Sequence, residues 1–244
     1  MVNVIWPIIW GITGLFITYT GFYQLKIKRL IENTPTSKIR SIAMGLVEIF
    51  GEVIPFNKEI IKSPFTNTNC VFYSYTIEEY RSSGKNRKWI LIKKDTSNNK
   101  FYLKDETGQV LIDPNKAHID LNKTYQTESE KDTSENIKQF LKEKNISLEN
   151  FLGVNKRLKF TEYILKQKDK LYILGTAADN PLVEEESSVE NSNDIMIQRG
   201  DFNSVYYISS KHETEVIKKY KREAIILLCI GINLTFISLF FFSR

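Results

Sequence analysis

Two uncharged apolar segments, at residues 4–25 and 224–242, constrain this 244-residue chain more than any other feature. A helix rises about 1.5 Å per residue, so about 20 apolar residues cross a hydrocarbon layer that is about 30 Å thick. Both segments are apolar on all sides, whereas the core helix of a soluble protein is usually amphipathic. The first segment also lacks the basic start and the cleavage pattern of a signal peptide. We therefore predict two transmembrane helices with a polar domain of about 200 residues between them.

Basic residues concentrate on the domain side of both apolar segments. Lys26, Lys28 and Arg29 follow the first segment, and a group that includes Lys218 and Lys219 precedes the second. Lys and Arg beside a span are retained in the cytoplasm, which predicts a cytoplasmic domain with both termini outside. The lipid bilayer is therefore a predicted partner. These cations either only set the orientation or also bind anionic headgroups, and the sequence leaves both interpretations open.

Small residues recur along one side of each predicted span. In lipid, helices associate through close packing of small side chains, because no water is expelled from between them. Both spans leave the same domain and are expected to be antiparallel neighbours, so the two rows of small residues are expected to face each other. The rows consist of Gly14, Thr18 and Gly21 in the first span and Gly231, Thr235 and Ser238 in the second.

The region between the spans, at 33–210, has the pattern of short β-strands separated by turns. The turn at 105–108 between two apolar runs is a strong hairpin signal. We predict a β-rich α+β soluble domain of antiparallel strands with small-barrel character, flanked by two transmembrane helices. Its expected parts are a strand-rich half (33–121), a polar loop (124–136), a helical segment (134–152) and a second strand-rich half (157–209). After the domain, residues 210–213 have the pattern of a capping box, which predicts a helix from residue 211 through the second span to residue 242.

Residues that usually carry chemistry are scarce in this chain. Cys70 is expected in a strand and Cys229 in a span, so they form no disulfide. With only His118 and His212 besides, the sequence predicts no Cys/His metal site. The nucleophile elbow, the P-loop and the dinucleotide-binding fingerprint are all missing. We predict no catalytic residue, no metal and no cofactor, and no nucleic-acid partner, because the basic residues cluster beside the spans.

One carboxylate in the second strand-rich half stands out. Glu162 shares its alternation with Phe160 and Ile164, so its side chain is expected to point inward. A buried carboxylate needs a partner, and Arg157 or a lysine in a structural ion pair is the favoured interpretation. The alternative is a general acid or base in a hydrolase-like site together with His118.

A series of spaced landmarks from about residue 33 to 222 resembles the GIDE domain, also called the BAM or "beside a membrane" domain. The resemblance implies structural roles, with glycines at turns and Phe65 and Trp89 in the core. The landmarks are Thr34, Pro35, Ser37, Gly45, Pro64, Phe65, Cys70, Trp89, Asp105, Gly108, Pro114, Gly153, Glu162 and Gly175.

The resemblance also implies a function class, and this sequence departs from the pattern of that class at one point. The domain is similar to that of MULAN-type mitochondrial RING E3 ubiquitin ligases, in which a zinc-binding RING follows the second span. Here only Ser243 and Arg244 follow it. We therefore expect a RING-less, prokaryotic member in the plasma membrane that acts as a binding, scaffold or sensing module for an unknown protein or lipid ligand. The alternative is a component of a RING-type E3 ubiquitin transferase that acts through a separate partner.

Overall fold

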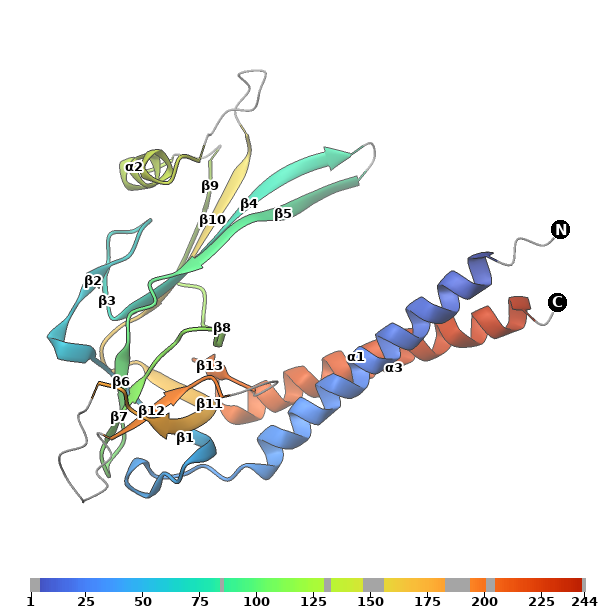
Figure 1. The fold of residues 1–244 in the computed structure, drawn as a ribbon. Helices are drawn as coiled ribbons and strands as arrows, with labels where there is room; N and C mark the ends of the chain where they lie inside the picture. Colours follow the sequence, from blue (N-terminus) through green and yellow to red (C-terminus); the bar gives the residue numbers. More distant parts are fainter. Residues whose placement is uncertain are drawn as a thin grey trace. The chain divides into compact units, whose positions relative to one another are not determined.

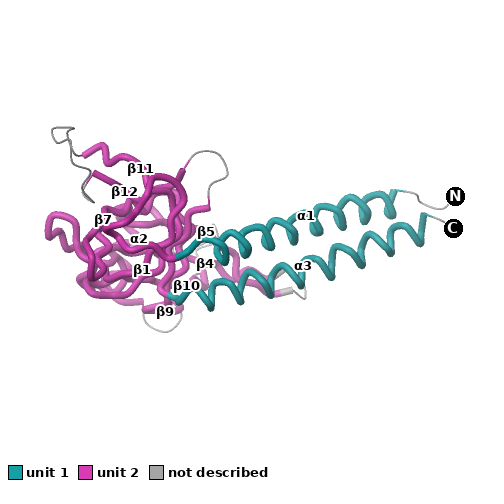
Figure 2. Tube along the Cα trace, turned by 90° about the horizontal axis from the view of Figure 1, so that it is seen from below, with its two compact units in different colours: residues 1–35, 211–244 teal, residues 36–210 magenta. Residues whose placement is uncertain are grey.

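The computed structural model describes residues 5–83, 86–129, 133–146, 156–182, 194–200 and 205–242. Gly153 and most of the polar, acidic segment at 181–193 lie outside the described residues. The chain divides into two compact units, Thr36–Ser210 and the two terminal segments Met1–Pro35 and Lys211–Arg244 (Figure 2).

The terminal unit consists of two long helices, α1 (Ile5–Asn33) and α3 (Glu213–Phe242), which lie side by side and antiparallel (Figure 1). Each is about 45 Å long at 1.5 Å per residue. Both are long and apolar enough to cross a membrane by length and composition. The prediction that one helix runs from near residue 211 through the second apolar segment is confirmed. The predicted capping box is wrong, because α3 begins at Glu213 and Ser210 lies before its cap position; the Ser210 hydroxyl instead accepts a hydrogen bond from the Asn122 N–H at 2.8 Å.

Five strands of the domain close into a small barrel. They follow each other as β1 (Gly45–Pro55), β6 (Phe101–Lys104), β7 (Gln109–Ile112), β12 (Ile195–Gln198) and β11 (Lys170–Asp179), and β11 pairs with β1 again to complete the ring. Two further strands, β13 (Tyr207–Ser209) and β8 (His118–Asp120), continue from β11. The pairs β7–β12 and β8–β13 are parallel and the other pairs are antiparallel. The predicted small-barrel character is therefore confirmed.

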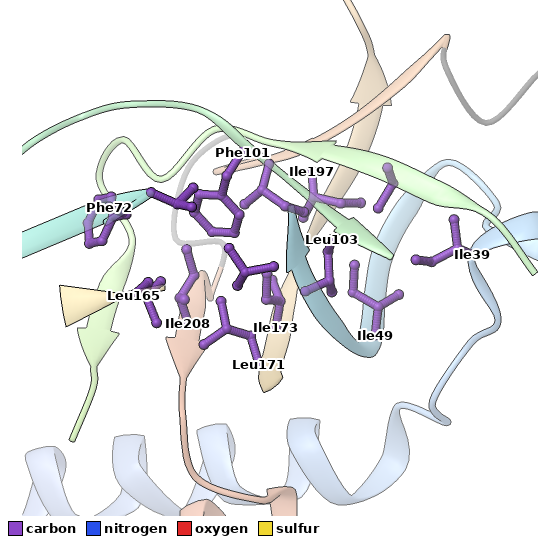
Figure 3. Close-up of a cluster of buried hydrophobic side chains, with 14 of the residues drawn as sticks. Ile39, Ile49, Phe72, Phe101, Leu103, Leu165, Leu171, Ile173, Ile197 and Ile208 are labelled. Atoms are coloured by element: carbon purple, nitrogen blue, oxygen red, sulfur yellow. The ribbon is translucent and has the colours of Figure 1, made fainter. Parts of the chain in front are cut away.

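The barrel interior follows the period-two alternation of its strands. On β1 the inward positions are Val47, Ile49 and Val53, and all three are buried. Figure 3 shows Ile49 packed in one cluster with Leu103 of β6 and other apolar side chains. Successive strand residues point to opposite faces, so a shift of one residue would move these apolar side chains out of the barrel. The burial pattern therefore specifies the register of β1.

A second, four-stranded antiparallel sheet has the order β5 (Asn86–Thr96), β4 (Phe72–Ser83), β10 (Leu158–Leu165) and β9 (Tyr125–Glu128). The short helix α2 (Glu135–Glu143) packs on one face of it, and the Ser134 side chain caps this helix by accepting from the Ile137 N–H. The centre of that packing is Phe65, whose ring lies 5.4–5.5 Å from the rings of Tyr75, Phe140 and Phe160. Its predicted place in the core is confirmed. The remaining elements are the hairpin β2 (Ile61–Lys62) and β3 (Asn69–Cys70), and two 3₁₀ turns, Ile39–Ser41 and Phe56–Lys58.

Two stretches differ from what their residue patterns favour. Thr34 followed by Pro35 is typical of a helix start, yet Thr36 forms a parallel bridge with Glu48 of β1 and the chain there is extended. The stretch at 124–136 is not only a loop, because residues 125–128 form β9 beside β10. Polar residues suit such an edge strand, since one of its faces remains in water.

Candidate functional site

The face of the four-stranded sheet opposite α2 carries an aromatic and basic cluster. The rings of Tyr80 on β4 and Trp89 on β5 lie 5.1 Å apart. The Arg157 guanidinium lies 5.0 Å from the Tyr80 ring centre, and the Lys159 ammonium lies 4.5 Å from the Trp89 ring centre. Cations at such distances from an aromatic face are attracted by about 0.5–1 kcal/mol each at exposed sites. Trp89 is thus half-buried on this face, and its predicted place in the core is wrong.

Two cations in this cluster, Arg157 just before β10 and Lys159 on β10, are already paired. Arg157 donates to Glu128 of β9 at 2.8 and 3.1 Å, and Lys159 pairs with Glu78 of β4 at 2.6 Å. Their charges are therefore largely neutralised within the sheet. Because both side chains also lie over the Trp89 ring, the ion pairs fix the position of that ring.

Positive charge without an ion-pair partner among the described residues lies on β5, the strand on the other side of β4. Four cations occupy it, and none forms an ion pair with another residue that the structure describes: Arg87, Lys88, Lys93 and Lys94. Between them Leu91 is 53% exposed and Ile92 is 38% exposed. An exposed apolar patch with a polar rim is a candidate interaction site. We call residues 87–94 of β5 the basic strand.

Glu162 on β10 is completely buried and anchors the turn at 63–68. Its carboxylate accepts hydrogen bonds from the Phe65 N–H at 2.7 Å, from the Thr66 hydroxyl at 2.6 Å and from the Ser63 hydroxyl at 3.1 Å. The turn thereby presents Phe65 to the core. Hydrogen bonds to a charged acceptor are about twice as strong as neutral ones, so this carboxylate is well compensated.

The expected partner of Glu162 is corrected by this geometry. Arg157 binds Glu128, and the hydroxyls and the N–H of the 63–68 turn take the place of an ion pair. His118 stacks on Tyr207 at 5.0 Å between ring centres, with 15° between the planes. The structure therefore gives Glu162 and His118 separate surroundings and does not bring them together in one of the described pockets.

Asp105 closes the β6–β7 hairpin as a turn residue. Its Oδ1 accepts from the Thr107 N–H, the Thr107 hydroxyl and the Gly108 N–H, and its Oδ2 accepts from the Ile39 N–H at 2.9 Å. Burial alone would raise the pKa of Asp105, but these hydrogen bonds favour the carboxylate and lower the pKa below its ordinary value. The predicted hairpin is confirmed, and Asp105 ties it to the 3₁₀ turn before β1.

The glycine landmarks serve different purposes. Gly45 has φ of +111° at the start of β1, a conformation that favours glycine. Gly175 lies inside β11 and not at a turn, which corrects the expectation. A Cβ at Gly175 would lie 2.7 Å from the Ile197 side chain and 2.9 Å from the Tyr206 ring, so this position needs glycine for packing across the barrel.

The other landmarks lie at turns and chain crossings. Thr34 donates its hydroxyl to the Leu30 carbonyl at the end of α1, and the Ser37 N–H donates to the Glu48 carbonyl. Pro114 accepts from the Ala117 N–H in the turn after β7. The remaining positions are the exposed Pro35, the half-buried Pro64 in the turn that Glu162 anchors, and the buried Cys70 on β3.

One buried carboxylate escaped the sequence analysis. Glu48 on β1 is 1% exposed and accepts from the Thr36 hydroxyl at 2.6 Å and the Tyr172 hydroxyl at 2.8 Å. Because Glu48 alternates with the inward Val47 and Ile49, the pattern points it away from the barrel interior, where water is expected. Nothing in the sequence near Glu48 indicates that Tyr172 of β11 packs against it.

The small residues of the terminal unit meet each other. A Cβ at Gly14 would lie 2.9 Å from the Gly231 carbonyl oxygen and from the Thr235 nitrogen, and one at Gly231 would overlap the Thr18 hydroxyl. The Ser238 hydroxyl donates to the Pro7 carbonyl at 2.5 Å. Gly21 faces Leu228 in place of a small residue. The two backbones therefore approach closely at Gly14 and Gly231.

Residues 72–242, from the start of β4 to the end of α3, match the sequence model of the GIDE family, described as E3 ubiquitin ligase. Comparisons with curated proteins and with solved structures give no match. Among the described residues, no group of three or more His, Cys, Asp or Glu side chains could hold a metal ion.

Proposed function

This chain belongs to the GIDE family, described as E3 ubiquitin ligase, and on that premise we propose that it is a membrane-anchored binding or scaffold module. The two long apolar helices hold the domain at a bilayer, and the domain recruits a partner there. The observation that carries this proposal is the basic strand, with four cations that have no ion-pair partner among the described residues and two exposed aliphatic side chains.

The ligase activity that the family description names would require a zinc-binding RING, which uses Cys and His ligands. The sequence holds two cysteines and two histidines, fewer than a RING requires. We therefore favour recruitment over ubiquitin transfer by these residues alone. The role as one component of a larger ligase has no specific observation in its favour.

The basic flanks of both apolar segments support a cytoplasmic domain with both termini on the other side of the membrane. The plasma membrane of a prokaryote is the location that we propose for this arrangement. In this arrangement the domain is confined near the membrane plane, so its effective concentration toward other membrane-bound partners is high. A weak binding surface is then sufficient for recruitment.

The proposal is tested by in-cell photocrosslinking of the full chain. A photoreactive amino acid replaces Leu91 in the basic strand, and in the control it replaces Lys142, which is exposed on α2. We expect discrete crosslinked proteins from the position of Leu91 that are missing from the control. Equal crosslinking from both positions, or none from either, would contradict a specific binding module.

A further inference from the structure

The basic strand is also the edge of its sheet. In the order β5-β4-β10-β9, β5 is an end strand of 11 residues, and among the described residues it pairs only with β4. An edge strand presents a row of unpaired N–H and C=O groups that another extended chain can pair with. Beyond Glu79, β4 pairs with β5 but no longer with β10, so the end of the hairpin projects as a two-stranded ribbon.

The pairing edge has a regular part and a defined limit. Residues 86–91 pair in register with β4, and the register shifts after Leu91 at a bulge opposite Ile77 and Glu78. A bulge twists the strand and interrupts regular pairing. A chain that adds to β5 therefore finds about six residues of regular edge.

The charges of the basic strand disfavour a second copy of β5 as the occupant. In an antiparallel pair centred on the strand, Arg87 and Lys88 would lie opposite Lys94 and Lys93. A parallel, in-register pair would also place each cation opposite itself. Like charges directly opposite each other destabilise a strand pair.

The same charges fit an acidic chain. Cations flank Leu91 and Ile92 on both sides, so the complementary segment has apolar residues in its middle and carboxylates at its ends. A lipid surface matches the charge but offers no row of main-chain donors and acceptors. Since β5 presents both features together, a peptide matches more of what the strand offers.

We propose that β5 takes up an extended acidic segment of a partner protein as a fifth strand of its sheet. This inference rests on the proposed function and adds the mode of binding and the chemistry of the partner. Backbone pairing with residues 86–91 supplies the alignment, and the carboxylates contact the cations at 87–88 and 93–94.

The test uses the full chain in phosphatidylcholine nanodiscs and a fluorescent peptide, Asp-Glu-Val-Thr-Val-Thr-Val-Asp-Glu. A second peptide of the same sequence carries N-methyl groups at alternate residues, which remove donors but keep the charge. We expect saturable binding that N-methylation weakens at least tenfold. The double variant Lys88→Glu/Lys94→Glu is expected to weaken it at least tenfold, whereas the control Lys142→Glu on α2 leaves it within twofold.

Three results would overturn strand addition. The first is equal binding of the methylated peptide, which would show a charge effect only, and the second is no peptide binding. The third is a photocrosslink from the position of Leu91 to phosphatidylglycerol, in nanodiscs that contain it, which the double variant abolishes. If peptide binding fails while the in-cell crosslink from Leu91 to a protein persists, the proposed function as a binding module is supported and only the proposal of strand addition is refuted.

Discussion

Replacing Glu162 by Gln tests how the domain holds its aromatic core. The carboxylate accepts three hydrogen bonds, from Phe65, Thr66 and Ser63, and each bond to a charged acceptor contributes about 1.5–3 kcal/mol. Gln keeps an oxygen for the Phe65 N–H but places an NH₂ group toward the two hydroxyls, which then have to turn. We expect a net loss of about one charge-assisted bond, or about 2 kcal/mol, which lowers the melting temperature by about 4–8 °C.

The matched control is Glu128→Gln, which makes the same chemical change in a partly exposed ion pair. Such pairs contribute about 0–1 kcal/mol, so this variant is expected to melt close to the parent. Unfolding of the full chain in detergent is followed by Trp89 fluorescence, with Trp6 and Trp10 replaced by Phe so that one reporter remains. If Glu162→Gln costs no more than Glu128→Gln, the anchoring role of the buried carboxylate is refuted.

Three further predictions follow from the described contacts. Cysteines at Gly11 and Ser238 are expected to crosslink, because a Cβ at Gly11 would lie 3.7 Å from the Ser238 Cβ, and Gly231→Ile should abolish the crosslink by separating α1 from α3. Burial raises the pKa of the Cys70 thiol to about 11, so in a chain without the second cysteine maleimide is expected to label Cys70 at pH 8 only after unfolding; rapid labelling of the folded chain would contradict this. Because the pKa of Asp105 is lowered in the folded chain, its carboxylate stabilises the fold at pH values above 3.8, the ordinary pKa of Asp. This stabilisation is lost as the pH falls through the pKa that Asp105 has in the folded chain. Asp105→Asn is therefore expected to be less stable at pH 7 but to lose less stability on acidification, and parallel acid curves for the two chains would refute the assignment.

The parts of the fold that local patterns encode were predictable from the sequence. The strand at 101–104, the turn after it and the strand at 109–112 appear as expected, because hairpin formation depends on neighbouring residues. The long terminal helices also follow directly, since an uncharged run of spanning length has few alternatives. Both signals are contained in stretches of fewer than 30 residues.

The features that failed depend on partners far along the chain. Nothing near Glu162 indicates that the turn at 63–68 supplies its hydrogen bonds, because these residues are separated by almost 100 positions. Trp89 was expected in the core as a landmark of the family resemblance, yet its strand lies at a sheet edge, where one face stays in contact with water. Gly175 was assigned to a turn, although its role is to admit Ile197 and Tyr206 across the barrel. In each case tertiary packing decided what a local pattern left open.

The residues of the basic strand can be read from the sequence, but their lack of ion-pair partners among the described residues could not be predicted from it. The sequence shows Arg87, Lys88, Lys93 and Lys94 around an apolar stretch, in the half of the domain where strands were expected. That these cations form no ion pairs among the described residues, while Arg157 on the same sheet is paired, follows only from the order of the strands.

The central claim, a domain held on one face of a bilayer by two spanning helices, is tested most directly by protease protection of the full chain. Tags are placed at Met1, within the segment 181–193 and after Arg244, in sealed vesicles whose cytoplasmic face points outward. The account predicts that protease removes the internal tag while both terminal tags survive until detergent is added. Loss of all three tags together, or release of the intact chain from the vesicles by alkaline carbonate, would contradict it.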